Sequence, residues 1–135
     1  HLLASTLTVL ADNGCDADRV SVAGALEIPQ ALAAAVAAGA IGGEGKRYAG
    51  AIALGCVVRG ETSHYDIVCN NANHWLMETA IRHSIPVGNA ILTVDTREQA
   101  LARAAGGQPS GKGGDAARAC LGLIALKQGF AGASA

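Results

Sequence analysis

Two hydrophobic patterns alternate along the chain. Helical spacing at the start predicts a helix; its hydrophobic positions are Leu2, Leu3, Leu7, Val9 and Leu10. The segment 48–58, YAGAIALGCVV, is apolar almost throughout, which is typical of a strand buried on both faces of a parallel sheet. The chain therefore predicts a mixture of helices and buried strands.

The rest of the chain continues the alternation of predicted helices and strands. Further strands are predicted at 19–23 and 85–95, and further helices from about 29, at 65–84, at 96–105 and at 115–127. Thr96 is placed to cap its helix, with Gln99 in the capping-box position. Strands that alternate with helices imply βαβ units, so we expect a layered α/β domain with helices on both faces of a parallel sheet. A length of 135 residues fits a single domain, 1–135.

Composition excludes several classes of protein. Ten Lys and Arg residues stand against eleven Asp and Glu residues, so no basic surface for nucleic acid is expected. The longest uncharged run, 28–43, is too short to span a bilayer, and we expect a cytoplasmic protein without a membrane partner. The cysteines are too widely spaced for a zinc site or a disulfide framework, and we expect them to be small buried residues; they are Cys15, Cys56, Cys69 and Cys120.

The stretch VVRGETSH, residues 57–64, falls where a site is expected, because ligands gather at the carboxyl ends of parallel strands. Free amides near Gly60 and Thr62, at the start of the next helix, could bind a phosphate group. Thr62 and Ser63 could equally be simple helix caps. His64 at the helix start would stay neutral beside the positive end of the dipole and could act as a base, or it could be structural.

A glycine-rich loop between the last two helices is flanked by Arg103 and Asp115. An arginine there could bind a phosphate in bidentate geometry, oriented by the carboxylate, or both could be solvated surface charges. Lys112 is followed by Gly113 rather than Ser or Thr, which excludes the phosphate-binding loop of nucleotide triphosphatases.

Four segments in this order resemble the lumazine synthase family: GALEIP from 24, IALGCVVRGETSHYDIVCN from 52, ILTVDTREQALARA from 91 and GKGGDAA from 111. The resemblance implies a three-layer αβα sandwich around a flavodoxin-like parallel sheet of four strands. It also places the first of those strands, and an aromatic residue that stacks on the substrate, before His1. We therefore expect the domain to be incomplete at its N-terminus.

The resemblance implies an enzyme of riboflavin biosynthesis. Such an enzyme condenses 5-amino-6-ribitylaminouracil with 3,4-dihydroxy-2-butanone 4-phosphate to 6,7-dimethyl-8-ribityllumazine, phosphate and water, with no metal or organic cofactor. Two alternatives are a flavin or lumazine carrier that keeps the fold without catalysis, and a purely structural shell protein.

The resemblance also assigns residues, position by position. His64 matches the proton-transfer residue, and Arg103 and Asp115 match the phosphate anchor and its acidic partner. The other matching positions hold the substrates: Ala25, Leu26 and Glu27 the ribityl chain, Val57 and Val58 the pyrimidine, Gly60, Glu61 and Thr62 the butanone phosphate, and Asn89 the pyrimidine from a neighbouring subunit.

The family's assembly implies a homopentamer with sites between subunits. Some members form sixty-subunit shells, but the loop AGGQPSGKGG is slightly longer here than in those members and contains Pro109. We therefore expect isolated pentamers.

Overall fold

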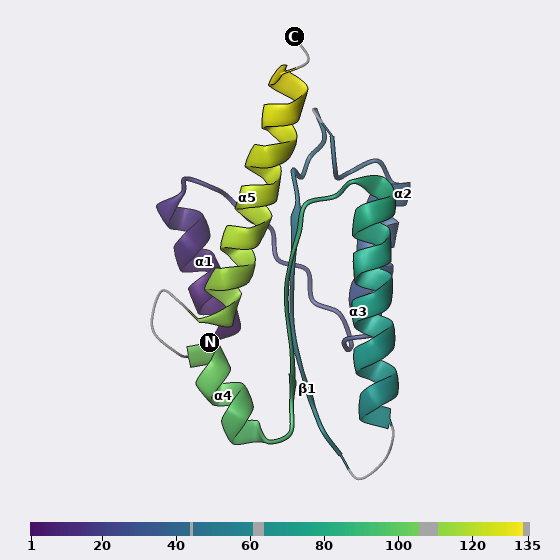
Figure 1. Ribbon diagram of the computed structural model, residues 1–135, viewed down its shortest axis with the longest axis vertical. Coiled ribbons are helices and arrows are strands. Elements are labelled where there is room, and N and C mark those ends of the chain that lie inside the picture. The colour runs from purple at the N-terminus through teal and green to yellow at the C-terminus, as the bar shows by residue number, and fades with distance from the viewer. Residues whose placement is uncertain (44, 61–63, 106–110, 134–135) are drawn as a thin grey trace.

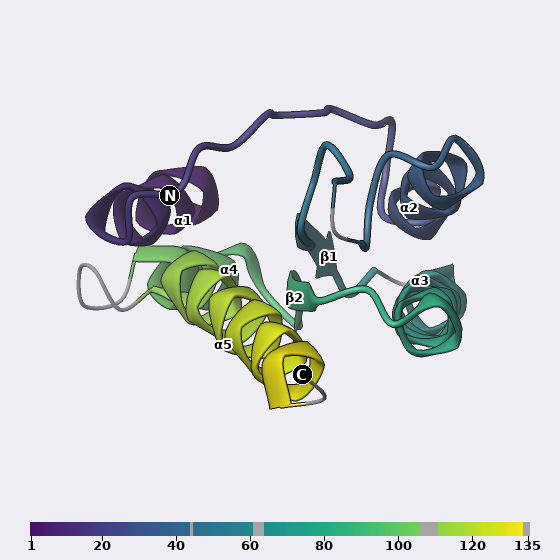
Figure 2. The same cartoon turned by 90° about the horizontal axis from the view of Figure 1, so that it is seen from above.

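The computed structural model describes residues 1–43, 45–60, 64–105 and 111–133, except for the side chains of residues 103–105 and 133. Its elements are α1 (Leu2–Asp12), α2 (Glu27–Ala37), β1 (Ala51–Val58), α3 (His64–His83), β2 (Val87–Val94), α4 (Arg97–Ala105) and α5 (Lys112–Ala133). They form three layers, with α1, α4 and α5 on one side of the strands and α2 and α3 on the other (Figure 2). The predicted α/β class is confirmed.

The two strands are parallel and in register from Ala51 opposite Val87 to Val58 opposite Val94. A parallel pair needs a crossover connection, and α3 supplies it. The carboxyl ends of both strands therefore lie at one end of the molecule, the lower end in Figure 1, where α3 and α4 begin.

The main core lies between the strands and the α2–α3 layer. Leu76 of α3 is almost completely buried there, at 2% exposure, and burial of such a side chain contributes about 1.5–3 kcal/mol. The other buried members of this cluster are Leu32, Ile41, Ala53, Ala72, Ala80, Ile85, Val87 and Ile91. Smaller clusters pack on the opposite face, among α1, α4, α5 and β2. Apolar burial on both faces fixes the strands between the helix layers.

A glycine determines how closely α5 approaches the sheet. A Cβ atom added to Gly88 of β2 would lie 1.9 Å from the carbonyl oxygen of Ala116 in α5. Any side chain at this position would force the helix away from the strand, because contacts with backbone atoms cannot be relieved by a rotamer change.

The strand predicted at 19–23 is wrong. This segment belongs to the irregular connection between α1 and α2, and its Val20 and Val22 are 75% and 39% exposed. The connection crosses from one helix layer to the other without joining the sheet (Figure 2). A strand forms only where a neighbouring backbone supplies hydrogen-bond partners, and within the described residues β1 pairs with β2 alone. The described sheet thus has two strands, where the sequence predicted three, the fourth strand that the resemblance implied being expected before His1.

Two further expectations need correction. β1 is less buried than predicted, since Ala53 is buried but Cys56 and Val58 are exposed; in the described part of the chain it has a strand neighbour on one edge only. The last helix begins at Lys112 rather than 115. It starts earlier because α1 caps it, as the backbone N–H of Gly114 donates to Ser5 Oγ at 3.2 Å.

Candidate functional site

The candidate site lies where the two strands end. The backbone N–H of Arg59 donates to the carbonyl of Val94 at 2.9 Å, which continues the ladder one step beyond the strands. His64 is the first residue of α3, and its side chain is exposed. The structure therefore places the predicted base at the predicted end of the sheet.

The loop between β1 and α3 is described only in part. At Gly60 an added Cβ would meet nothing within 4 Å, so the backbone is open to a ligand on that side. Glu61 and Thr62, expected to bind the butanone phosphate, lie outside the described residues, as does Ser63.

Sequence reasoning missed one polar cluster at this end of the sheet. Arg59 Nε donates to Asp95 Oδ1 at 2.8 Å, and the Arg59 guanidinium lies over the ring of Tyr65, 4.5 Å from its centroid. The hydrogen bond to Asp95 raises the pKa of Arg59 above its ordinary value. A signal was present, because Arg59 directly follows one predicted strand, Asp95 ends the other, and parallel neighbours bring such positions together.

The start of α4 is also fixed at this end of the sheet. Thr96 caps the helix as predicted, since its hydroxyl accepts from the backbone N–H of Gln99 at 3.2 Å. The side chain of Gln99 accepts in return from the N–H of Asp95 at 2.8 Å. The capping box is thus formed one residue earlier than the standard pattern, with Asp95 in place of Thr96 as the donor.

The turn before α2 and the end of β1 contact one core cluster. Ala25 and Val57 pack against the same buried cluster, and Ile28 of α2 lies over Gly55 of β1. Leu26 is among the residues that line a shallow hollow of about 400 Å³ between α2 and α3. Glu27 is the first residue of α2. The structure thus packs Ala25 on the core cluster that Val57 also contacts, whereas Leu26 faces the hollow between the helices and Val58 is exposed.

Asn89 does not join this group within one chain. Its amide donates to Asn73 Oδ1 and its oxygen accepts from the N–H of Ile91, both at 2.8 Å. It lies near the amino end of β2, and at about 3.3 Å per residue it is roughly 20 Å from Asp95. A role in the same site would need a second subunit.

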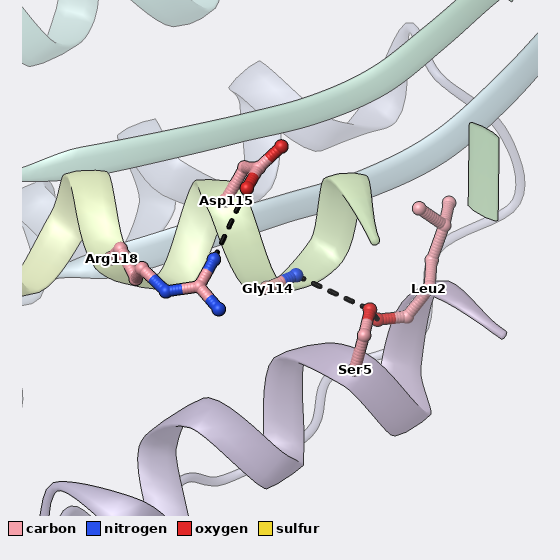
Figure 3. A network of polar contacts seen from close by, with 5 residues as sticks. All are labelled: Leu2, Ser5, Gly114, Asp115 and Arg118. Carbon is pink, nitrogen blue, oxygen red and sulfur yellow. Dashed lines mark hydrogen bonds and ion pairs between the residues drawn. The ribbon is translucent and has the colours of Figure 1, made fainter. Parts of the chain in front are cut away.

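Arg103 and Asp115 lie on α4 and α5, on either side of residues 106–110, which are outside the described part. Asp115 Oδ1 accepts from Arg118 at 3.1 Å, one turn along the same helix (Figure 3). The side chain of Arg103 is outside the described residues, so its pairing with Asp115 stays a prediction.

Other kinds of site find no support in the described ranges. Those ranges contain no group of three His, Cys, Asp or Glu residues that could hold a metal ion, and no helix there is long and apolar enough to cross a membrane. All four cysteines are free thiols; Cys69 and Cys120 are buried, and burial raises the pKa of both, whereas Cys15 is half-buried and Cys56 is exposed. The expectation that all four are buried is therefore only half right.

Fold and site together define a class: an α/β protein with parallel strands whose polar side chains gather at the carboxyl ends. Residues 1–128 match the sequence model of the family described as 6,7-dimethyl-8-ribityllumazine synthase. The chain belongs to this family.

Proteins of that name are similar over almost the whole chain. The one from Methylorubrum populi is 47% identical over 95% of this chain and 74% of its own length. The one from Azorhizobium caulinodans is 46% identical over 95% and 77%, and the one from Agrobacterium fabrum is 45% identical over 97% and 86%. The resemblance drawn from the sequence blocks is confirmed.

Proposed function

We propose that the protein catalyses the condensation of 5-amino-6-ribitylaminouracil with 3,4-dihydroxy-2-butanone 4-phosphate to 6,7-dimethyl-8-ribityllumazine, with release of phosphate and water. The observation that carries this proposal is membership of the synthase family over residues 1–128. The position of His64, at the helix start beside the end of β1, supports it.

The proposed reaction joins groups that the substrates already contain. The amine of the pyrimidine attacks the ketone of the butanone and a first water leaves, which gives an imine. Elimination of the phosphate group then generates a second carbonyl, and the ribitylamino nitrogen closes the ring on it with loss of a second water. The protein must therefore hold the two substrates in contact and move protons. Holding them accounts for most of the acceleration, and we assign the proton transfers to His64.

The remaining roles are proposed for residues matched to the family's substrate-binding positions. We propose that residues 57 and 58 bind the pyrimidine through the backbone, and that the turn 25–27 binds the ribityl chain. Gly60, with Glu61 and Thr62, is proposed to hold the phosphate group together with Arg103. Asp115 is proposed to orient that arginine, which requires it to exchange its contact with Arg118 or to share it.

We propose further that the protein is a homopentamer in the cytoplasm, with each site completed by a neighbouring subunit. The position of Asn89 supports this, because a single chain leaves it roughly 20 Å from the strand ends. No metal or organic cofactor enters the proposed reaction, since amine and carbonyl both come from the substrates.

Replacement of His64 tests the central assignment. His64→Ala is expected to lower kcat by roughly 10²- to 10⁴-fold, the usual contribution of a positioned acid or base, with smaller changes in KM. Turnover is followed by the near-ultraviolet absorption of the product when both substrates are mixed.

His83→Ala is the matched control, because His83 ends the same helix at its other terminus and should leave kcat unchanged. An unaltered kcat in His64→Ala would refute the assigned role. Tight binding of ribityl pyrimidines by the unmodified protein, without any turnover, would instead identify a carrier.

A further inference from the structure

Arg59 links three elements at the functional end of the sheet. It is the first residue after β1, its guanidinium donates to Asp95 directly after β2, and the same group lies over the ring of Tyr65 in the first turn of α3. One guanidinium thus contacts both a carboxylate and an aromatic ring. A lysine cannot make both contacts in this geometry.

The contacts of Asp95 extend this link to α4. The backbone N–H of Asp95 donates to the side chain of Gln99, and the N–H of Gln99 donates to Thr96, the cap of α4. A continuous set of hydrogen bonds therefore runs from Arg59 to the first turn of α4. These contacts join α3, which begins with His64, to α4, which carries Arg103.

We infer that Arg59 and Asp95 form a positioning pair that fixes the starts of α3 and α4 relative to each other. The inference rests on the proposed function, in which His64 moves protons and Arg103 anchors the phosphate. The pair sets the separation of these two elements without itself contacting the substrates.

The exposure of the pair supports a geometric rather than a stabilising role. The side chains of Arg59 and Asp95 are 52% and 62% exposed, and exposed ion pairs contribute little to global stability. Catalysis is more sensitive, because a displacement of about 1 Å between reacting groups can cost roughly 10²-fold in rate.

The chain contains a matched control for this arrangement. Arg47 pairs with Asp18 at 3.1 Å and lies over the ring of Tyr48, 5.1 Å from its centroid. This second trio has the same chemistry, but Arg47 and Tyr48 precede β1 and so lie at the opposite end of that strand.

The test compares Arg59→Met, Asp95→Asn, the double variant and Arg47→Met. For each Arg59 or Asp95 variant we expect kcat to fall about tenfold and KM for the butanone phosphate to rise, with KM for the pyrimidine and the urea midpoint nearly unchanged. The double variant should lose no more than the worse single variant, because both remove the same link. Arg47→Met should match the unmodified protein in kcat and in both KM values.

A loss of correctly folded protein would lower kcat alone, so the rise in one KM separates positioning from a structural defect. Amide hydrogen exchange gives a second readout that does not depend on turnover: the first turns of α3 and α4 should exchange faster in Arg59→Met and not in Arg47→Met. An unmodified protein without turnover would refute the proposed function, while the exchange experiment would still test the pair. Unchanged kinetics and exchange in Arg59→Met, additive losses in the double variant, or an equal loss in Arg47→Met would overturn the inference.

Discussion

Individual polar residues at the strand ends are exposed rather than buried. His64, Arg59 and Asp95 all face solvent in the single chain. Water and salt weaken the attraction between exposed charges such as those of Arg59 and Asp95, so these side chains act mainly through the directions that their hydrogen bond and ring contact impose. The site is therefore sensitive to side-chain shape as well as to charge.

The trio of Arg47, Asp18 and Tyr48 leads to a prediction about the pH dependence of stability. The hydrogen bond from Tyr48, and then that from Arg47, lowers the pKa of Asp18 below its ordinary value of 3.8. The hydrogen bond between Tyr48 and Asp18 also raises the pKa of Tyr48 above its ordinary value of 10.0. Asp18 therefore stabilises the fold above pH 3.8, and this contribution is lost as the pH falls through its folded pKa. The Tyr48 contribution is present below pH 10.0 and is lost as the pH rises through its folded pKa.

The measurement is the urea midpoint of the unmodified protein and of Asp18→Asn at several pH values. The unmodified protein should have the higher midpoint near neutral pH, and the difference should shrink below about pH 3.8. Tyr48→Phe removes the first donor and should show a similarly reduced dependence in acid. A difference that stays constant from neutral to strongly acidic pH would contradict the assigned interaction.

At the scale of elements, small residues set the distance between α1 and α5. A Cβ atom on Gly113 would lie 2.1 Å from the carbonyl oxygen of Leu2 and 2.7 Å from Ser5 Oγ. The Ser5 hydroxyl caps α5 by accepting from the N–H of Gly114, as Figure 3 shows. It also donates to the carbonyl oxygen of Leu2. The first turns of the two helices are therefore in direct backbone contact.

Gly113→Ala is expected to lower the free energy of unfolding by about 1–3 kcal/mol, since the helices must separate to admit the methyl group. Gly122→Ala on the same helix is the control: nothing lies within 4 Å of its added Cβ, and alanine should raise stability by roughly 0.5–1 kcal/mol through helix propensity. Urea denaturation followed by circular dichroism measures both. Equal stability of the two variants would refute the close approach.

At the scale of the whole molecule, the outer faces of the helix layers retain large apolar side chains. Ile81 of α3 is 71% exposed and Phe130 of α5 is 70% exposed, with Trp75 and Leu126 also at the surface. Large apolar side chains at the surface are often covered by a partner chain. This distribution agrees with the proposed assembly of several subunits.

Sedimentation equilibrium tests that assembly. We expect a particle of five chains of 13.4 kDa each and no sixty-subunit shell. Phe130→Asp should weaken the association, because a charge at an apolar contact is costly to bury. A monomer at the concentration used for turnover, with full activity, would contradict both the pentamer and a site shared between subunits.

How far the sequence predicted the site depended on the range of each interaction. The cap at Thr96 was predicted and is confirmed because its donor lies three residues away on the same helix start. The pair of Arg59 with Asp95 was not predicted, because it spans 36 positions and exists only through the register of two strands. The early start of α5 was missed for the same reason, since its cap comes from Ser5 of another helix.

The sequence by itself determined the alternation of helices and strands, the α/β class and the family, since hydrophobic periodicity and short motifs are written in neighbouring residues. Only the tertiary structure decided that 19–23 stays outside the sheet, that Gly88 and Gly113 hold α5 close, and that Arg59 meets Asp95. The physical reason is that a strand needs a partner backbone and a close approach needs two surfaces. Both are properties of the packed chain rather than of any local segment.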